Sequence, residues 1–361
     1  MSAFTTPSRL SLLALSLSAS MLAGQAAWAQ SELSQAAEKE GKVIIYSTTD
    51  TKAAAPLISA FEAANPKIKV EYHDMNSTEL YNRYISEQAS GSNSGDIVWS
   101  SSMDSAMRLA TDYAASYASP QIPSLPSWAV WENKAFGTTY EPTVFIYNNR
   151  LIKPEEVPKT HAELAKLVDS DKDRFRNKVT TYDIEKSAVG YMLAAQDSKK
   201  GQSYWDFIKG VGSANLVLQS STGTMMERVS SGENLIGYNL LGSYAETRAA
   251  KDKAIGIVYP SDYTLVLSRV AFISNKAQNP NAARVFLDYM LSKDGQDILA
   301  NKSELASIRS DVEGDNDVDG LTKKLAGVEL TPIPVDSSLL DFLKQKERLD
   351  FIKQWRAAAN K

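Results

Sequence analysis

The sequence contains no cysteine and only two histidines among its 361 residues. Without cysteine the chain forms neither disulfides nor thiolate metal sites, and thiol catalysis is excluded. The metalloprotease helix motif, the Gly-x-Ser-x-Gly nucleophile motif and the P-loop are also missing. We therefore expect no catalytic residues, no metal site, no cofactor and no enzymatic activity, although 43 acidic residues leave room for a carboxylate pair in an acid/base role.

Basic residues are not in excess either. The formal net charge is −4 at pH 7, and no stretch concentrates lysine and arginine. Binding to nucleic acid needs a concentrated basic surface, so that class of function is disfavoured. At about 100–200 residues per domain, the length of the chain predicts two domains.

A long apolar run occurs only near the N-terminus, at residues 10–22. Arg9 precedes the run and the small-residue pattern Ala27-Trp28-Ala29 follows it, which is typical of an export signal and its cleavage site. Serines interrupt the run, and it is shorter than the roughly 20 residues that span a bilayer. We expect residues 1–29 to be a cleaved signal peptide and the mature chain to begin at Gln30 in the periplasm.

Strand patterns alternate with helix patterns after this segment. Such strand-loop-helix units, joined by short connections, are typical of a mainly parallel α/β sheet. Further strands are predicted where the chain crosses between two lobes. After the last of these strands, helical spacing of apolar residues predicts one amphipathic helix. The units are residues 41–46 with 53–64, 68–72 with 77–85, and 96–99 with 104–114; the crossing strands are 144–148 and 264–274; the late helix is 281–299.

A family resemblance is carried by residues 43–51, 96–102, 141–148, 279–283 and 286–296. In their order and spacing these segments resemble the type II periplasmic solute-binding proteins of ABC importers. The resemblance is to the branch that includes ferric-iron, phosphonate, hexose-phosphate and phosphoglycerate binders. It implies two α/β lobes with hinge-linked open sheets and a ligand enclosed between them.

The resemblance also implies a division of the chain and a set of partners. Lobe 1 is expected from residues 30–142 and 265–318, and lobe 2, with the C-terminal helices, from residues 143–264 and 319–361. The expected partners are a small ligand and an ABC permease in the inner membrane, and we expect a monomer. In open α/β sheets, ligands bind outside the carboxyl ends of the strands, where loops meet helix starts.

The ligands for iron that the resemblance implies are not found at their expected positions. Ferric binders of this family use a histidine in the first loop, a glutamate after the third strand and two adjacent tyrosines. Here the histidine position falls near Asp50 or Thr51 and the glutamate position near Ser101. No Tyr-Tyr pair occurs, and its counterpart is the segment from Tyr238 to Tyr244. Direct binding of iron is therefore disfavoured.

Hydroxyl and amide side chains are concentrated where strands or loops meet helix starts. Backbone N–H groups and the positive end of the helix dipole suit an anion there, and hydroxyls add donors without adding charge. Serine and threonine before a helix are also common caps, so the sequence leaves two roles for these residues, helix capping and ligand binding. The candidates are Thr48, Thr49, Asp50, Thr51, Asn76, Ser77, Thr78, Ser100, Ser101, Ser221 and Thr222.

Further candidates combine a charge or an aromatic ring with a position near the expected cleft. Arg269 lies within an apolar run and is costly to bury unpaired, so it meets either an acidic residue such as Glu141 or an anionic ligand. A tyrosine offers both a wall and a hydroxyl, although a core position is the simpler interpretation of each. Asp183 either orients ligand hydroxyls or caps the next helix. The other candidates are Tyr140, Thr143, Tyr182 and Tyr238.

Taken together, the sequence predicts a periplasmic solute-binding component of an ABC transporter. Its expected ligand is a small anionic organic solute, phosphorylated or carboxylated, held between two lobes. A ferric-iron binding protein is one alternative. A ligand-sensing adapter for the periplasmic domain of a membrane sensor kinase is the other, because the resemblance includes a branch with regulatory members.

Overall fold

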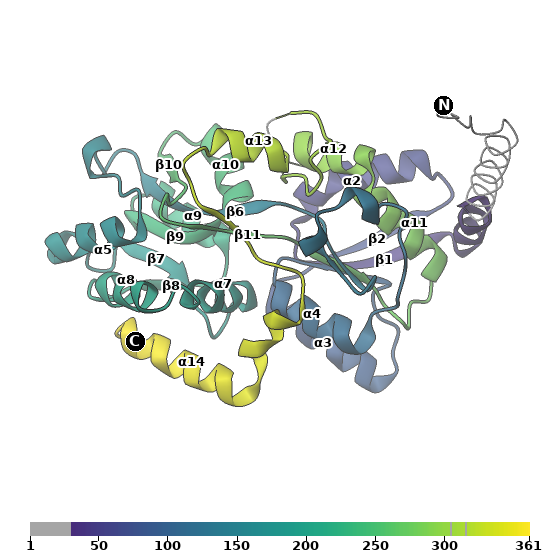
Figure 1. Cartoon of the computed structure of the whole chain (residues 1–361), viewed down its shortest axis with the longest axis horizontal. Helices are drawn as coiled ribbons and strands as arrows, with labels where there is room; N and C mark the ends of the chain where they lie inside the picture. Colours follow the sequence, from purple (N-terminus) through teal and green to yellow (C-terminus); the bar gives the residue numbers. More distant parts are fainter. Residues whose placement is uncertain (1–29, 304, 315) are drawn as a thin grey trace, which may run out of the picture.

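The computed structural model describes residues 30–303, 305–314 and 316–361. The signal peptide predicted for residues 1–29 lies outside these residues. Two α/β lobes lie side by side, each built around an open sheet (Figure 1), and this confirms the predicted fold class. In the described ranges, no helix has the length and apolar character needed to cross a membrane.

The first lobe contains a six-stranded sheet in the order β2-β1-β3-β12-β5-β4. β1, β2 and β3 are parallel, as predicted, so their carboxyl ends lie at one edge of the sheet. The strands are β1 (Lys42–Ser47), β2 (Lys69–Asp74), β3 (Ile97–Ser100), β4 (Val130–Trp131), β5 (Ala135–Gly137) and β12 (Val270–Ile273). The helices are α2 (Thr51–Ala64), α3 (Ser77–Ser90), α4 (Met103–Tyr113), η1 (Ile122–Ser124), η2 (Ser127–Ala129), α11 (Pro280–Leu291) and α12 (Lys293–Asn301).

Helices cover both faces of this sheet, which explains why β1 is almost continuously apolar. Val43 and Ile45 pack in one apolar cluster with residues of α2 and α11, whereas Ile44 and Tyr46 pack with residues of α3 and α4. Because side chains alternate along a strand, both faces of β1 are buried. Residues 30–40 form a further helix that precedes β1.

The second lobe contains a seven-stranded sheet in the order β13-β11-β6-β9-β7-β8, with β10 beside β6. Its strands are β6 (Glu141–Asn148), β7 (Val179–Tyr182), β8 (Val217–Gln219), β9 (Ile236–Leu241), β10 (Ile255–Val258), β11 (Thr264–Leu267) and β13 (Leu330–Pro332). Its helices are η3 (Pro154–Glu156), α5 (His161–Ser170), α6 (Lys172–Phe175), α7 (Ala188–Ser198), α8 (Gln202–Gly212), α9 (Thr222–Ser230) and α10 (Gly242–Lys251). The chain ends with α13 (Val318–Lys324), η4 (Ser337–Leu343) and α14 (Gln345–Ala358).

Two predicted elements are each divided in the structure. The single strand predicted for residues 264–274 is wrong, because β11 pairs in the second sheet and β12 in the first, with Ser268 and Arg269 between them. The single helix predicted for residues 281–299 is also wrong. Ser292 ends α11 and caps α12, since its hydroxyl accepts a hydrogen bond from the Gly295 N–H at 3.1 Å.

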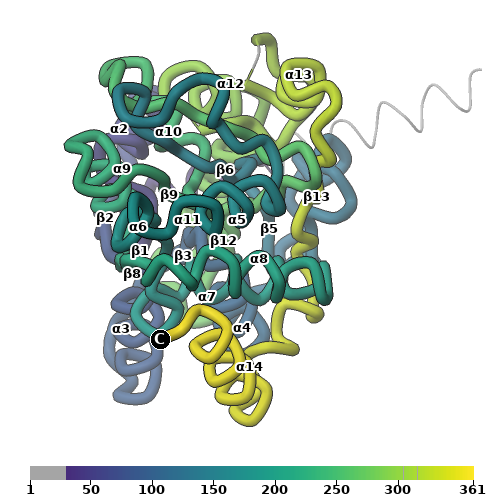
Figure 2. The backbone as a smooth tube through the Cα atoms, turned by 90° about the vertical axis from the view of Figure 1, so that its left-hand side faces the viewer, coloured from purple at the N-terminus to yellow at the C-terminus, as the bar shows by residue number. Residues whose placement is uncertain are grey.

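The two lobes share part of one apolar core. Met103 and Met107 of α4 belong to the same cluster of buried residues as Met192 and Leu193 of α7, and Leu339 of η4 joins them. Figure 2 shows α3, α4, α7 and α14 gathered at one end of the molecule. The C-terminal segment thus contacts both lobes, with η4 against α4 and α14 against α8.

Candidate functional site

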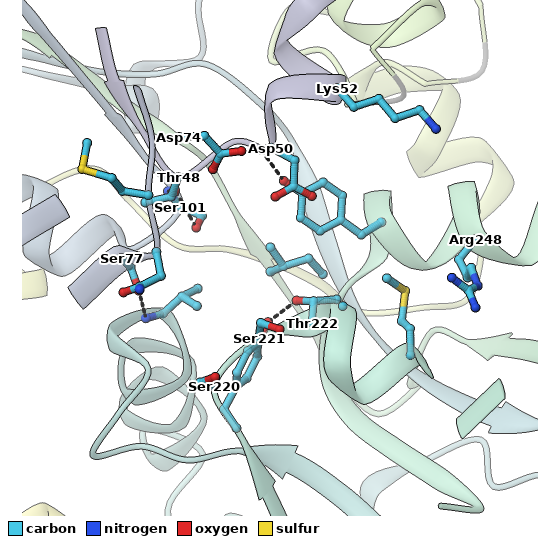
Figure 3. A pocket seen from close by; sticks show the side chains of 18 of the residues that line it. Thr48, Asp50, Lys52, Asp74, Ser77, Ser101, Ser220, Ser221, Thr222 and Arg248 are labelled. Atoms are coloured by element: carbon cyan, nitrogen blue, oxygen red, sulfur yellow. Dashed lines mark hydrogen bonds between the residues drawn. The ribbon is translucent and has the colours of Figure 1, made fainter. Parts of the chain in front are cut away.

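A cavity of about 560 Å³ lies between the lobes, where the carboxyl ends of β1, β2 and β3 face the starts of α9 and α10 (Figure 3). This position is the one expected for ligand sites in open α/β sheets. Eight of the predicted site residues line the cavity: Thr48, Asp50, Asn76, Ser77, Ser101, Tyr182, Ser221 and Thr222.

Two hydroxyls tie the first-lobe loops together at this edge. The backbone N–H of Ser101 donates to Thr48 Oγ1 at 2.8 Å, and the hydroxyl oxygens of the two residues are 3.1 Å apart. The loop after β1 and the loop after β3 are therefore held in one arrangement. Each hydroxyl keeps further hydrogen-bonding capacity, because a hydroxyl is both a donor and a double acceptor.

Two carboxylates lie on the first-lobe wall of the cavity, and one of them is hydrogen-bonded to the protein. Asp74 accepts hydrogen bonds from the Thr51 N–H at 2.9 Å and from the Thr51 hydroxyl at 3.2 Å, so it caps the start of α2. Asp50 precedes α2, and its carboxylate makes no hydrogen bond with the described residues. Burial and the nearby Asp74 raise the pKa of Asp50, while Arg269 opposes this shift. Asp50 thus has free acceptor capacity in an unfavourable local field.

The second-lobe wall is built around the start of α9. The Ser221 hydroxyl accepts from the Thr224 N–H at 3.2 Å and caps the helix, and the Thr222 hydroxyl bonds with the Tyr182 hydroxyl. Gly223 also lines the cavity, and a Cβ there would meet only Ser221 Oγ, at 3.8 Å. The first N–H groups of a helix lack intrahelical partners and carry the positive end of its dipole.

Cationic side chains of the second lobe also line the cavity. Lys186 and Arg248 line the cavity, and each also pairs with an aspartate of its own lobe, Asp183 at 3.4 Å and Asp252 at 3.3 Å. Both pairs are long and partly exposed, so the cations keep donors for a ligand. Sequence analysis missed these residues, and their spacing in the chain offers no signal for them.

Three hydrogen bonds connect the lobes beside the cavity. The Asp50 N–H donates to the Tyr244 hydroxyl at 3.3 Å, the Val189 N–H donates to Ser77 Oγ at 3.4 Å, and the Thr78 hydroxyl donates to the Lys186 carbonyl at 3.0 Å. Thr78 therefore serves the contact between the lobes and does not line the cavity.

Arg269 lies outside the cavity wall, in the segment that joins β11 to β12. Its guanidinium pairs with Glu141, from Nε to Oε1 at 2.7 Å and from Nη2 to Oε2 at 3.0 Å, and both side chains are fully buried. Nη1 also donates to the Thr49 hydroxyl at 3.0 Å. Of the two roles that the sequence left open for Arg269, the structure contains the internal ion pair. Thr49 is part of the same buried network.

The remaining predicted residues do not line the cavity. Ser100 and Thr143 are buried, and Tyr238 is buried in the core of the second lobe. Asp183 accepts from the Glu185 N–H at 3.0 Å in the turn before α7, whereas the cap of α7 is Ser187. Tyr140 lines a second cavity of about 300 Å³ beside the crossing segments, and Thr51 bonds with Asp74.

Asp74 and Tyr244 are cavity residues that the sequence could have indicated. Asp74 ends β2, so it lies at the same sheet edge as Thr48 and Ser101. Tyr244 is the last residue of the segment in which the resemblance to ferric binders places the counterpart of their tyrosine pair. Within the described residues, no group of three or more His, Asp or Glu side chains could hold a metal ion.

Comparison with known proteins agrees with this arrangement. The family model for bacterial extracellular solute-binding proteins matches residues 56–324, and the chain belongs to this family. The substrate-binding protein of an ABC transporter from Agrobacterium tumefaciens is 34% identical, with a TM-score of 0.83 over 88% of this chain and 94% of that one. No curated protein matches the sequence. The chain is therefore a solute-binding protein of the type II class, not an enzyme.

More distant structures share the fold. The periplasmic binding protein AfuA from Actinobacillus pleuropneumoniae, with fructose-6-phosphate bound, is 18% identical, with a TM-score of 0.73 over 89% of this chain and 99% of that one. Iron-bound HitA from Pseudomonas aeruginosa is also 18% identical, with a TM-score of 0.69 over 88% and 99%. At this identity the likeness extends to the fold alone.

Proposed function

We propose that this protein is the periplasmic solute-binding component of an ABC transporter and that it captures a small anionic organic solute, phosphorylated or carboxylated, between its lobes. The observation that carries the proposal is the second-lobe wall of the cavity. There the start of α9, the cations Lys186 and Arg248, and the Ser221 and Thr222 hydroxyls face the same space.

These groups are complementary to a phosphate or carboxylate. Helix starts bind anions through backbone N–H groups and the dipole, and a lysine or arginine adds a charge-assisted hydrogen bond. The lining as a whole carries more cations than carboxylates: Lys52, Lys186, Arg248 and Lys251 against Asp50 and Asp74. A cavity of about 560 Å³ is within the usual range for a small organic ligand.

Apolar and aromatic side chains support an organic ligand and not a bare ion. Met75, Val189, Met226 and Leu241 line the cavity beside the polar groups, and Tyr182 and Tyr244 add rings. Such walls pack against a carbon skeleton. AfuA, which has the same fold, holds a sugar phosphate, and this supports a ligand of the proposed kind.

The ferric alternative has less support. Iron-bound HitA has the same fold, but ferric iron needs several hard anionic oxygens, and among the described residues only two carboxylates line this cavity. One of them, Asp74, already caps α2. A ferric complex of an anionic chelator would still enter as an anion.

Capture follows from the two-lobed arrangement. The anionic group binds to the donors of one lobe, and the other lobe closes and excludes water, which strengthens the polar contacts. A few kcal/mol of differential affinity makes the closed form dominant, and the closed form is then presented to the permease.

Thermal shift tests the proposal. The mature protein would be melted with sugar phosphates, phosphoglycerates, dicarboxylates, ferric chloride and neutral sugars. A ligand at about 100 times its Kd adds about 2.7 kcal/mol of apparent stability, so at least one anionic organic solute should raise Tm by several degrees. A shift with ferric ion alone, or with neutral sugars alone, would contradict the proposal.

A further inference from the structure

The cavity has walls of opposite character. In Figure 3, Asp50 and Asp74 lie on one side, and Ser220, Ser221 and Thr222 lie on the facing side. Asp50 belongs to the loop after β1, Asp74 ends β2, and the second set lies at the start of α9. An anionic group that binds at α9 therefore leaves the other end of the ligand directed toward two carboxylates.

We propose, on the basis of the function proposed above, that the ligand is bipolar and that Asp50 selects an ammonium group at the end opposite to the anionic group. Asp50 is the residue available for this role because its carboxylate has no hydrogen bond with the described residues. Asp74 is engaged by the start of α2 and adds negative charge beside it.

The charges around Asp50 leave the local field negative. Arg269 is the nearby cation, but its guanidinium is paired through two hydrogen bonds with Glu141, which largely cancels its charge. Lys52 follows Asp50 by two residues and also lines the cavity, from the first turn of α2. Burial is the main cause that raises the pKa of Asp50, and repulsion from Asp74 adds to it, while Arg269 opposes the shift. A ligand cation would relieve this repulsion, whereas a methyl group or a second anion would not.

An aromatic residue is placed beside this carboxylate. Tyr244 lines the cavity, and its hydroxyl accepts the Asp50 N–H at 3.3 Å. A carboxylate next to an aromatic ring is a favourable environment for an ammonium ion. Arg269 already lies over the Tyr244 ring, 5.1 Å from its centroid, so the carboxylate and not the ring must provide most of the attraction.

Pairs of ligands that differ only at one end can test the contribution of the ammonium group separately from that of the anionic group. Phosphoethanolamine and propyl phosphate have nearly the same shape but end in an ammonium and a methyl group, and 2-hydroxyethyl phosphate ends in a hydroxyl. The pair 4-aminobutyrate and pentanoate repeats the comparison with a carboxylate head. Isothermal titration calorimetry of the mature protein should give at least tenfold tighter binding for the ammonium member of the pair that binds.

The variant Asp50→Asn assigns the selectivity to this residue. Because the Asp50 side chain makes no capping hydrogen bond and is repelled by Asp74, the neutral amide should leave Tm the same or slightly higher. It should remove the tenfold preference for the ammonium ligand while leaving the affinity for propyl phosphate the same or higher. Asp173→Asn, at a side chain that is 93% exposed, is the matched control for loss of one negative charge and should keep the preference.

Each outcome bears on one proposal. If the phosphates and carboxylates all fail to bind, and no other anion binds either, the proposed function itself is wrong. If propyl phosphate binds as tightly as phosphoethanolamine, the anionic site stands and the ammonium selectivity is refuted. Equal binding of the hydroxyl and ammonium ligands, or an Asp50→Asn variant that keeps the preference, refutes it too.

Discussion

The cavity and the segments that cross between the lobes contain the same kinds of polar residue. They differ in whether these residues are hydrogen-bonded to other residues of the protein. At the crossing, Arg269, Glu141 and Thr49 are fully buried and satisfy one another. In the cavity, Asp50 and Ser221 keep capacity for hydrogen bonds and face open space. A polar residue near a cleft therefore indicates a ligand only when the protein has left it without a full set of partners.

The largest effect should come from breaking the fully paired region. Arg269→Met would leave the buried Glu141 without its cation, and loss of one member of a buried pair costs about 3–5 kcal/mol in free energy of unfolding. Urea unfolding would measure it. Lys346→Met breaks the exposed pair with Asp350 and should change the free energy of unfolding far less, because solvent screens such a pair. Equal effects of the two variants would contradict the distinction between the regions.

Asp197 is an intermediate case between the two regions, because its carboxylate is buried but only one of its oxygens has a hydrogen-bond partner among the described residues. Asp197 accepts from Asn239 Nδ2 at 2.7 Å through one oxygen, and its other oxygen has no hydrogen-bond partner in the described part of the chain. Burial raises the pKa of Asp197 from 3.8 to about 6. Between these values the folded state holds a proton that the unfolded state has released. The contribution of this group to stability is therefore complete below pH 3.8 and is lost as the pH rises through about 6.

Asp197→Asn removes this titration while keeping an oxygen for Asn239. Its free energy of unfolding should exceed that of the wild type by up to about 3 kcal/mol above pH 7, and the difference should vanish below about pH 4. Urea unfolding at a series of pH values would measure the difference. A stabilisation that does not change with pH would show that burial of the charge is not its cause.

The smallest effect is expected in the open region, where binding changes and stability does not. Ser221→Asp retains the cap of α9, because aspartate caps a helix as well as serine does, but it places a negative charge in the anion site. Affinity for the best anion of the thermal-shift panel should fall at least tenfold, which is about 1.4 kcal/mol. Ser221→Asn, a neutral cap, is the control for calorimetry and should bind far more tightly than the aspartate variant.

Much of the fold follows from local patterns. The first three strands and their helices could be predicted because β-branched runs, helical spacing and short connections all agree. The division of residues 264–274 could not, since β11 and β12 are both apolar and only their pairing with different sheets separates them. Periodicity carries no information about which sheet a strand joins.

The cavity was predicted in part for the same reason. Loops at strand ends indicated Thr48, Asp50 and Ser101, because parallel strands bring their carboxyl ends together. Lys186 and Arg248 could not be found, since Lys186 reaches the cavity from the turn before α7 and Arg248 from α10, and the positions of both segments depend on packing. Tyr238 was a reasonable candidate by position, but it is buried in the core of the second lobe.

The apolar cluster that α4 shares with α7 has a consequence for melting. In many two-domain proteins each domain melts separately, and calorimetry records two transitions. Here Met103 and Met107 would lose their neighbours Met192 and Leu193 as soon as either lobe came apart. Heating should therefore give one endotherm for the whole molecule, because part of the interior of each lobe lies in this shared cluster.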